Sequence, residues 1–513
     1  MDEDSIVSAT RDALETDPEV FQERVEADAQ VIKREINDGT FDNQQGIIGL
    51  EYEFYAVEDV DIASRDTVAD PGALRRVPRR MLELIGFEKE LGLHNAEMST
   101  SPQPINSYGI RAQEAEVQAR LCTALDRAEA EGMRLVSNAL WTIPPQGETG
   151  REYLTDSVEA DGVRIATNMS DSARYHAMAN TDPPAGMRID APNVTLQADT
   201  VMPESLITSI QPHYQVPHAP DLPEYFRYGL RIAGPLLALG VNSPFFPPDL
   251  YDDVPPEDIV EDAWAEHRIR VFETSMNPEG IDKVRFPEDV STVEEAVDRI
   301  AADETFVPVP VERGDRFDDE FAHFRTKHGT YWRWVRPVFG GATRSKANAR
   351  IEFRFLPGQP TVRDTIAFQA AVAGLVEGMH ARNHPVLDMD WREARENFYV
   401  AMRDGLDADL QWIDAEGDRT DDLEAMYTDL FDVATEGLRT RGLSQEEIAR
   451  YLGPLRERVR RGATPARWKR WQVRQRLADG DDLAEAIHGM QRAYVGRQSE
   501  TLIEGSFVDW LDN

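Results

Sequence analysis

Three short segments, far apart in the chain, share one alternating pattern of polar and apolar residues, and this pattern constrains the fold most. They are GLEYEF (49–54), QPHYQV (211–216) and ARIEFRF (349–355). Successive side chains of a β-strand point to opposite faces of the sheet, so each segment would bring polar side chains to one face and large apolar ones to the other. The pattern predicts an antiparallel sheet with one face on a hydrophobic core and the other face polar.

The polar face of this predicted sheet carries an unusual choice of side chains. A face that only meets water needs no more than Lys, Ser, Thr or Gln, and a solvated face would explain any one of the strands alone. The three strands together present Glu51 and Glu53, then Gln211, His213 and Gln215, and finally Arg350, Glu352 and Arg354. Carboxylates and imidazole are ligands for divalent cations, and arginine is suited to phosphate groups. The set favours a site for Mg²⁺ or Mn²⁺ together with a phosphorylated ligand.

The segment before the last strand adds further positive charge. YWRWVRPVFGGATRSKANARIEFRF (331–355) carries Arg336, Arg344 and Arg350 on either side of a Gly340-Gly341 turn. A basic turn between two strands would explain this segment equally well. The sequence contains neither Gly-x-x-x-x-Gly-Lys-Ser/Thr nor Gly-x-Gly-x-x-Gly, the glycine-rich loops that hold phosphates in many nucleotide enzymes. Any ATP would therefore have to be held through metal ions and arginines.

Acidic residues dominate the charge of the chain. Asp and Glu total 94 against 55 Lys and Arg, which gives a net charge of -39 and excludes binding to nucleic acid or anionic membranes through bulk charge. A hydrophobic content of 41% argues against disorder. Because most cations are Arg and the acidic residues are spread along the whole chain, we interpret the charge as a salt-adapted, halophilic surface. The N-terminus has no basic, apolar leader and no run of about 18 apolar residues occurs, so we expect a cytoplasmic protein.

The 513 residues exceed one ordinary domain and divide by pattern into three parts. Residues 1–40 are predicted to form an N-terminal helical segment. Residues 41–387 mix short strands, helices and Pro-rich turns, which is typical of an α+β fold. Residues 388–513 are predicted to be helical, with a capping box at Ser444 and Glu447.

Two further features have a structural interpretation. Residues 456–476 collect arginines with Trp468 and Trp471, and could bind a nucleotide or nucleic acid, although docking onto an acidic face of the same chain is favoured by electrostatic attraction. Cys122 is the only cysteine, so no disulfide can form within the chain. Apolar residues recur around Cys122 at helical spacing, which predicts a buried structural thiol.

Several motifs together resemble one known family. In chain order they are GLEYEF, HNAEMSTSPQP (94–104), QPHYQ (211–215), NSPFF (242–246), RIEFRF with the following TVRDTIAFQAAV (361–372), and ENFYVAMRDGLDADL (396–410). This order is similar to that of the glutamate-cysteine ligase type 2 family of carboxylate-amine ligases, within the glutamine synthetase superfamily. The resemblance covers residues 45 to 415. It implies that residues 41–387 form the catalytic domain, with a glutamine synthetase-like curved antiparallel sheet flanked by helices.

The resemblance implies an ATP-dependent ligase that joins the γ-carboxylate of glutamate to an amine through a γ-glutamyl phosphate. Cysteine is the favoured amine, with Mg²⁺ or Mn²⁺ as the metal and ATP as co-substrate. The partners would be these small molecules, with no nucleic acid and no membrane, and a homo-oligomer stays open. The alternatives are the same chemistry with a different amine, or a non-catalytic relative that binds a nucleotide or a protein partner.

The resemblance also implies roles for individual residues. The metal ligands would be Glu51, Glu53, Glu352 and His213. Arg354 would neutralise the transferred phosphoryl group, and Glu97 would supply an acidic group beside the glutamate site. ATP and the other substrates would be bound by Arg336, Arg344, Arg350, Arg174 and Gln211. Pro212 departs from the family pattern, because a proline inside a strand implies an edge strand or a bulge, and either would displace His213.

Overall fold

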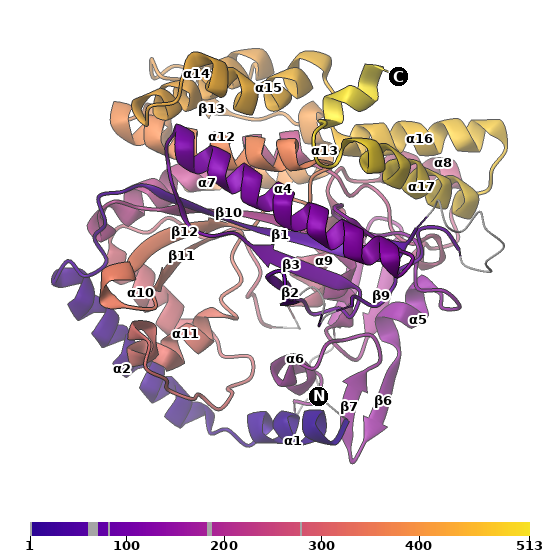
Figure 1. Cartoon of the computed structure of the whole chain (residues 1–513), viewed down its shortest axis with the longest axis horizontal. Helices are drawn as coiled ribbons and strands as arrows, with labels where there is room; N and C mark the ends of the chain where they lie inside the picture. Colours follow the sequence, from indigo (N-terminus) through magenta and orange to yellow (C-terminus); the bar gives the residue numbers. More distant parts are fainter. Residues whose placement is uncertain are drawn as a thin grey trace.

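An antiparallel sheet of eight strands lies at the centre of the computed structural model, which describes residues 3–59, 70–78, 80, 83–181, 187–277 and 280–512 (Figure 1). The path through six strands is β11-β12-β10-β1-β3-β2, and β4 and β5 also pair with β1. The strands are β1 (Ile47–Glu58), β2 (Phe87–Lys89), β3 (Asn95–Ser99), β4 (Gln103–Pro104), β5 (Met133–Val136), β10 (Ile210–Gln215), β11 (Val335–Gly340) and β12 (Asn348–Phe353). The three segments with the alternating pattern are β1, β10 and β12, and they are neighbours in the sheet.

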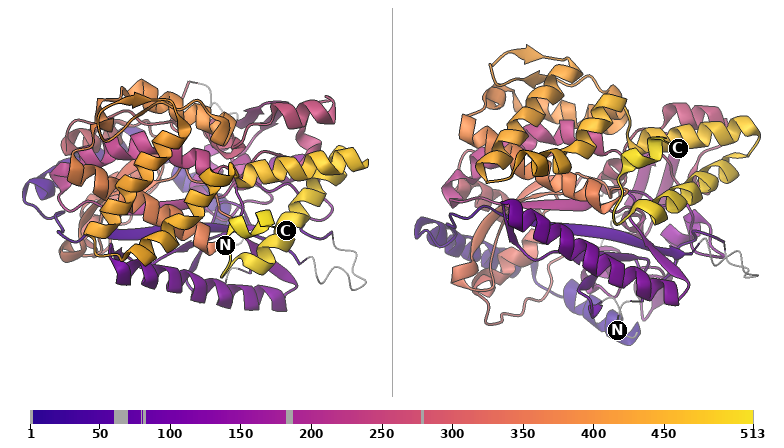
Figure 2. Two further views of the ribbon diagram at one scale, coloured as in Figure 1. Left: turned by 90° about the horizontal axis from the view of Figure 1, so that it is seen from above. Right: turned by 45° about the horizontal axis from the view of Figure 1, so that its top comes forward.

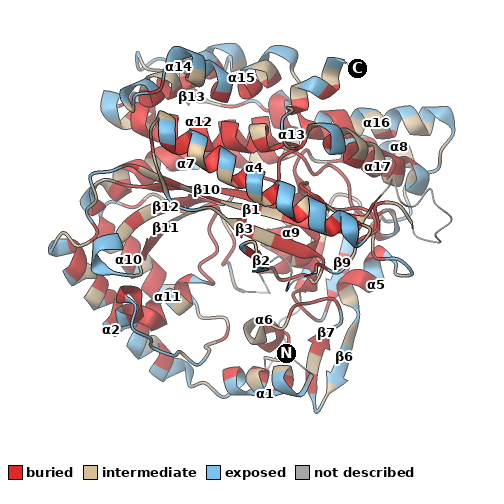
Figure 3. Cartoon of the chain, in the orientation of Figure 1, coloured by how far each residue is buried: buried red, intermediate tan, exposed pale blue. Residues whose placement is uncertain are grey.

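The apolar face of the sheet packs against three helices. Leu50, Tyr52 and Phe54 of β1 are at most 2% exposed. The helices are α4 (Ser107–Ala130), α7 (Leu222–Gly240) and α12 (Val362–Arg382), and α7 and α12 are buried along almost their whole length (Figure 3). The predicted α+β fold, an antiparallel sheet with helices on its apolar face, is confirmed.

Most of the chain after residue 390 is helical (Figure 2), and its helices pack on α12, on α7 or on one another. The helices are α13 (Trp391–Asp404), α14 (Leu423–Thr440), α15 (Gln445–Arg461), α16 (Pro465–Asp479) and α17 (Leu483–Thr501). Glycines let α12 and α14 approach closely, because a Cβ at Gly437 would lie 1.9 Å from the carbonyl oxygen of Gly374. Whether residues 388–513 form a separate domain stays a prediction.

The remaining elements include helices on the polar side of the sheet (Figure 1). Helix α2 (Pro18–Asn37) packs against α10 (Val293–Ala302) and α11 (Ala322–His328), and α1 (Glu3–Leu14) packs against α6 (Ala173–Met178). Smaller elements are α5 (Gly150–Thr155), α8 (Pro256–Asp262), α9 (His267–Ser275) and the two-stranded sheets β6 (Ser157–Ala160) with β7 (Val163–Ala166), β8 (Met187–Ala191) with β9 (Val194–Ala198), and β13 (Trp412–Ile413) with β14 (Arg419–Thr420). The chain begins on the polar side of the sheet and ends on the side of its apolar face (Figure 1). No helix in the described part of the chain is both long and apolar enough to cross a membrane.

Pro212 lies in a central strand, so the prediction of an edge strand is wrong and the alternative, a bulge, is what the structure shows. Strand β10 lies between β1 and β12. His213 pairs with Glu352, and Ser209 pairs with Pro357. The first strand therefore moves back by four residues while its partner moves forward by five. The extra residue on the β12 side is a bulge, and it interrupts the hydrogen-bond ladder between the two strands. Pro212, which has no N–H to donate, lies opposite this interruption. His213 stays in register and is not displaced.

The structure also tests the predictions for Cys122 and for the basic stretch 456–476. Cys122 is exposed on α4, so the prediction of a buried thiol is wrong. It lies one position after Leu121, which is fully buried, and the helix turns it by about 100° toward solvent. The basic stretch 456–476 docks onto its own chain as favoured: Arg458 is fully buried and pairs with Asp364 of α12 at 2.9 Å.

Candidate active site

The register of the strands brings the predicted residues together in rows across the polar face of the sheet. One row crosses four strands, from Gly49 to His213, Glu352 and Arg336. The next row pairs Glu51 with Gln211, and beyond it Glu53 pairs with Glu97 of β3. Directly paired residues of an antiparallel sheet point to the same face, so backbone pairing alone places these side chains side by side.

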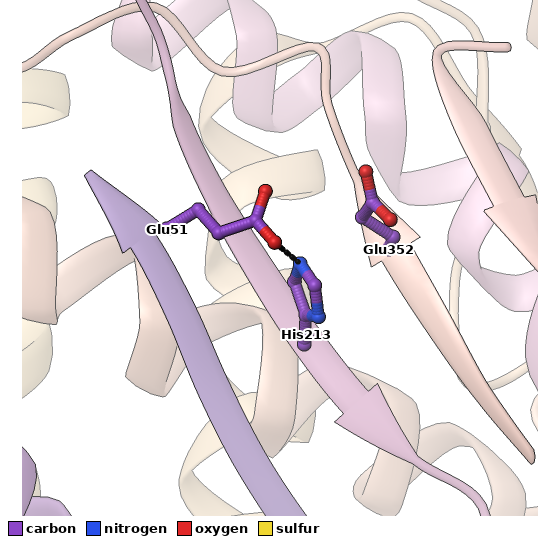
Figure 4. A group of neighbouring side chains, drawn as sticks. All are labelled: Glu51, His213 and Glu352. Atoms are coloured by element: carbon purple, nitrogen blue, oxygen red, sulfur yellow. Dashed lines mark ion pairs between the residues drawn. The ribbon is translucent and has the colours of Figure 1, made fainter. Parts of the chain in front are cut away.

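Glu51, His213 and Glu352 form a group that can hold a metal ion (Figure 4). One ligand atom from each of the three lies within 4.8 Å of the other two. Oε1 of Glu51 lies 3.4 Å from Nε2 of His213, and this buried nitrogen has no hydrogen-bond partner in the described part of the chain. Two carboxylates and an imidazole suit Mg²⁺ or Mn²⁺, so the residues fit the divalent cation that the resemblance implies.

Two arginines hold Glu352 in its ionised form. Its carboxylate lies 2.9 Å from Arg336 and 2.5 Å from Arg354. Burial raises the pKa of Glu352, but Arg336 and Arg354 outweigh this effect and hold the pKa well below its usual value. For Glu51, burial likewise raises the pKa and His213 lowers it, with a net decrease. Both carboxylates are therefore ready to bind a cation at neutral pH.

A second group of carboxylates behaves in the opposite way. Glu53 accepts hydrogen bonds from the amide and hydroxyl of Ser209 and from Gln211, yet burial and the nearby Glu90 raise its pKa to about 7. Burial, followed by the charges of Glu51, Glu90 and Glu53, raises the pKa of Glu97 well above its usual value. The side chain of Glu90 thus favours the protonated form of Glu97. These groups favour the protonated form unless a cation enters among them.

A cavity of about 520 Å³ opens over the row of Gly49 and His213. Its floor is the sheet, and Arg316, Arg325 and the Gly340-Gly341 turn at the end of β11 also line it. Arg350 lines the cavity and lies 3.3 Å from Nδ1 of His213. The cavity therefore adjoins the metal-binding group, and arginines and carboxylates both line it.

Gln211 connects the two groups of carboxylates. Its amide nitrogen donates to Glu53 at 2.8 Å and its carbonyl oxygen accepts from Arg354 at 2.6 Å. Arg174 of α6 is largely buried, and its guanidinium lies close to Gly329 at the cavity wall. It forms no ion pair with the part of the chain that the structure describes, and burial lowers its pKa. Arg174 is thus a cation available to a ligand.

Arg344 is the predicted residue that the structure places elsewhere. It is half exposed and pairs with Glu35 of α2 and with Glu320. The other ten predicted residues surround the sheet's polar face, and their catalytic and binding roles stay predictions. Glu90, Glu204 and Arg268 were missed in the sequence, since they come from a loop, a 3-10 turn and a short helix in which no alternating pattern marks a face. Burial, Glu90 and Glu53 raise the pKa of Glu204 well above its usual value, which places it with the second group.

Carboxylates that can hold a divalent cation, beside arginines and an adjoining cavity, are typical of enzymes that transfer phosphoryl groups from nucleotides. The model of the glutamate-cysteine ligase family 2 (GCS2) matches residues 47–500, and the chain belongs to this family. It is a carbon-nitrogen ligase, an ATP-dependent carboxylate-amine ligase, and the resemblance seen in the motifs is confirmed. No curated protein sequence matches the chain.

Solved structures with a similar arrangement include three ligases or synthetases, each 12% identical to this chain. A glutamate-cysteine ligase from Francisella tularensis has a TM-score of 0.44, with 90% of this chain and 94% of that chain covered. A bifunctional glutathione synthetase from Pasteurella multocida has a TM-score of 0.46, with 92% and 55% covered. The Pup ligase PafA has a TM-score of 0.39, with 86% and 71% covered.

Proposed function

We propose that this ligase joins the γ-carboxylate of glutamate to the amino group of cysteine, through a γ-glutamyl phosphate. The observation that carries the proposal is the position of Arg354. Its guanidinium bonds Glu352 on the side of the cavity, and through Gln211 it reaches Glu53 in the second group of carboxylates. A reacting phosphoryl group beside Arg354 would therefore have nucleotide on one side and substrate amine on the other.

The first step is supported by the cavity and its arginines. The bond between the γ-phosphorus and the oxygen leading to ADP breaks, and a new bond forms to a γ-carboxylate oxygen of glutamate. Arg336, Arg350 and Arg354 would stabilise the negative charge that spreads over the phosphoryl oxygens. A divalent cation held by Glu51, His213 and Glu352 would neutralise phosphate charge in the same place. The guanidinium of Arg174, which forms no ion pair within the described residues, would hold another carboxylate of glutamate.

The second step is supported by the carboxylates with raised pKa values. An amine reaches the site as an ammonium ion, and buried carboxylates attract it. The pair formed by Glu97 and Glu90 can accept the proton that the amine releases. The amine nitrogen then attacks the acyl carbon, and the bond from that carbon to the phosphate oxygen breaks, so phosphate leaves. Membership of an enzyme family favours this function over the non-catalytic alternative.

The test is ADP release from full-length protein with ATP, Mg²⁺ and glutamate, in high KCl because of the acidic surface. Cysteine and a panel of other amino acids and simple amines are supplied in turn, and the product with cysteine is identified by mass. We expect cysteine to give the highest kcat/KM. Turnover with a different amine would overturn only the choice of cysteine. Well-folded protein without amine-dependent ADP release would overturn the ligase chemistry at this site.

A further inference from the structure

A buried chain of charges leads from helix α16 to the backbone of Arg354. Its members are Lys469 of α16, Glu266 just before α9, and Arg268 at the start of α9. They are 2%, 0% and 3% exposed, respectively. Buried charges without partners are costly, so three of them in one line need an explanation.

At one end of the chain, Arg268 holds the backbone of Arg354. Its Nη2 donates to the carbonyl oxygen of Arg354 at 3.0 Å, and its guanidinium lies 5.3 Å from the ring centre of Trp334. The amide of Arg354 donates to the carbonyl oxygen of Trp334 at 2.9 Å. Both backbone polar groups of Arg354 are therefore fixed, one by Trp334 and the other by Arg268.

This support matters because Arg354 lies beyond the end of its strand. Strand β12 ends at Phe353, and its pairing with β10 stops at Glu352. The ladder that aligns Glu352 and His213 does not extend to Arg354, whose side chain must still meet Glu352 and Gln211. An error of about 1 Å in such a group can cost a hundredfold in rate.

At the other end, Glu266 pairs with Arg268, and Lys469 is connected to Glu266 through the backbone of Asn242. Glu266 lies 3.8 Å from Nε of Arg268 and accepts hydrogen bonds from the amide of Asn242 and the hydroxyl of Ser243. The ammonium group of Lys469 donates to the carbonyl oxygen of Asn242 at 2.6 Å. The carboxylate of Glu266 thus lies between Arg268 and the backbone of Asn242, and Asn242 connects Glu266 to Lys469 of α16 through its amide and its carbonyl oxygen.

We propose that Arg268 is a positioning residue for Arg354 and is held in place by Glu266, and that Lys469 of the C-terminal helical region supports Glu266 through the backbone of Asn242. The inference rests on the proposed function, in which Arg354 faces the transferred phosphoryl group. It also assigns a role to the basic stretch 456–476, whose Lys469 is buried behind the site and meets no solvent.

The experiment compares two conservative variants of buried arginines. Arg268→Lys keeps the positive charge and loses the planar group that reaches Arg354 and stacks on Trp334. Arg231→Lys is the matched control, because Arg231 of α7 is 1% exposed and also donates to a carboxylate, Asp289, and to a carbonyl oxygen, that of Met389. Both variants are measured for thermal stability, for kcat and KM, and for binding of Mg²⁺ with ATP by calorimetry.

We expect Arg268→Lys to lower kcat by about tenfold to a hundredfold, with the KM and the Kd for ATP within about threefold of wild type. Arg231→Lys should lose comparable stability and keep kcat within about threefold. Glu266→Gln should lower kcat in the same direction as Arg268→Lys. Equal values of kcat for the two lysine variants, or a change confined to KM, would overturn the inference.

Crystal structures of the two variants separate this inference from the proposed function. We expect Nη1 of Arg354 to move away from Glu352 in Arg268→Lys and to stay beside it in Arg231→Lys. An unmoved Arg354 in Arg268→Lys overturns the positioning role whichever amine the enzyme uses. A displaced Arg354 supports the role even if cysteine proves not to be the substrate.

Discussion

Replacing Glu51 or Glu352 by glutamine is expected to abolish turnover in both cases but to change stability very differently. The side chain of Glu352 is 4% exposed and lies between Arg336 and Arg354. Removing its charge leaves two buried guanidiniums without their carboxylate, a change that costs about 3–5 kcal/mol. The side chain of Glu51 is 26% exposed, and its nearest partner is His213 at 3.4 Å. The loss of this contact should cost no more than about 1 kcal/mol.

The assay is urea unfolding at neutral pH with a chelator present, followed by the same titration with Mg²⁺. In chelator, Glu352→Gln should unfold with a free energy several kcal/mol below wild type, whereas Glu51→Gln should remain within about 1 kcal/mol. Mg²⁺ should stabilise the wild type by about 2.7 kcal/mol at 100 times its Kd, and either variant by less. Because the folded pKa of Glu352 is lowered, its contribution is present above its ordinary pKa and is lost as the pH falls.

Two results would refute this reasoning. If Glu352→Gln were as stable as Glu51→Gln in chelator, the two arginines would not depend on Glu352 for compensation. If Glu51→Gln kept near-native amine-dependent ADP release, Glu51 would not be a metal ligand. The double variant Arg336→Gln with Glu352→Gln is the internal control. It should recover part of the lost stability, because it removes one of the two uncompensated charges.

Three other predictions concern the cavity, a pH effect and helix packing. Gly49→Leu should fill the cavity floor and raise the KM for ATP at least tenfold, with little change in melting temperature. ADP release measures the KM and circular dichroism measures the melting temperature. An unchanged KM would place the nucleotide elsewhere. Burial raises the pKa of Glu273 to about 6, so its neutral form stabilises the fold and that contribution to the free energy of unfolding is lost as pH rises through 6. In urea titrations, the stability of Glu273→Gln should therefore gain about 1 kcal/mol relative to wild type between pH 5 and pH 8. A stability difference that does not change with pH would contradict the prediction. Gly437→Ala should lower the free energy of unfolding by about 1–3 kcal/mol, because its Cβ would clash with α12. The control is Gly453→Ala in α15, where a Cβ would meet no atom within 4 Å, and it should raise the free energy of unfolding by about 0.5–1 kcal/mol. Equal effects of the two variants would contradict the role of Gly437.

The predicted sheet and most of the site followed from strand periodicity. Glu51, His213 and Glu352 lie on one face because their strands alternate, and a period of two admits only one face for each of them. Arg344 shows the limit of this reasoning: it lies in a turn, where no period sets direction, and it pairs with Glu35 and Glu320 instead. Cys122 shows another limit, since a shift of one position on a helix exchanges a buried place for an exposed one.

The sequence by itself determined the antiparallel sheet with two different faces, the type of chemistry on its polar face, and the family. It did so because side-chain direction in a strand is a local property, set by the geometry of each residue. Only the tertiary structure decided which carboxylates gain or lose protons and which residues outside the strands complete the site. Glu90, Glu204, Arg268 and Lys469 come from segments up to several hundred residues apart. Their pKa values and roles depend on burial and on neighbours, which exist only after the chain has folded.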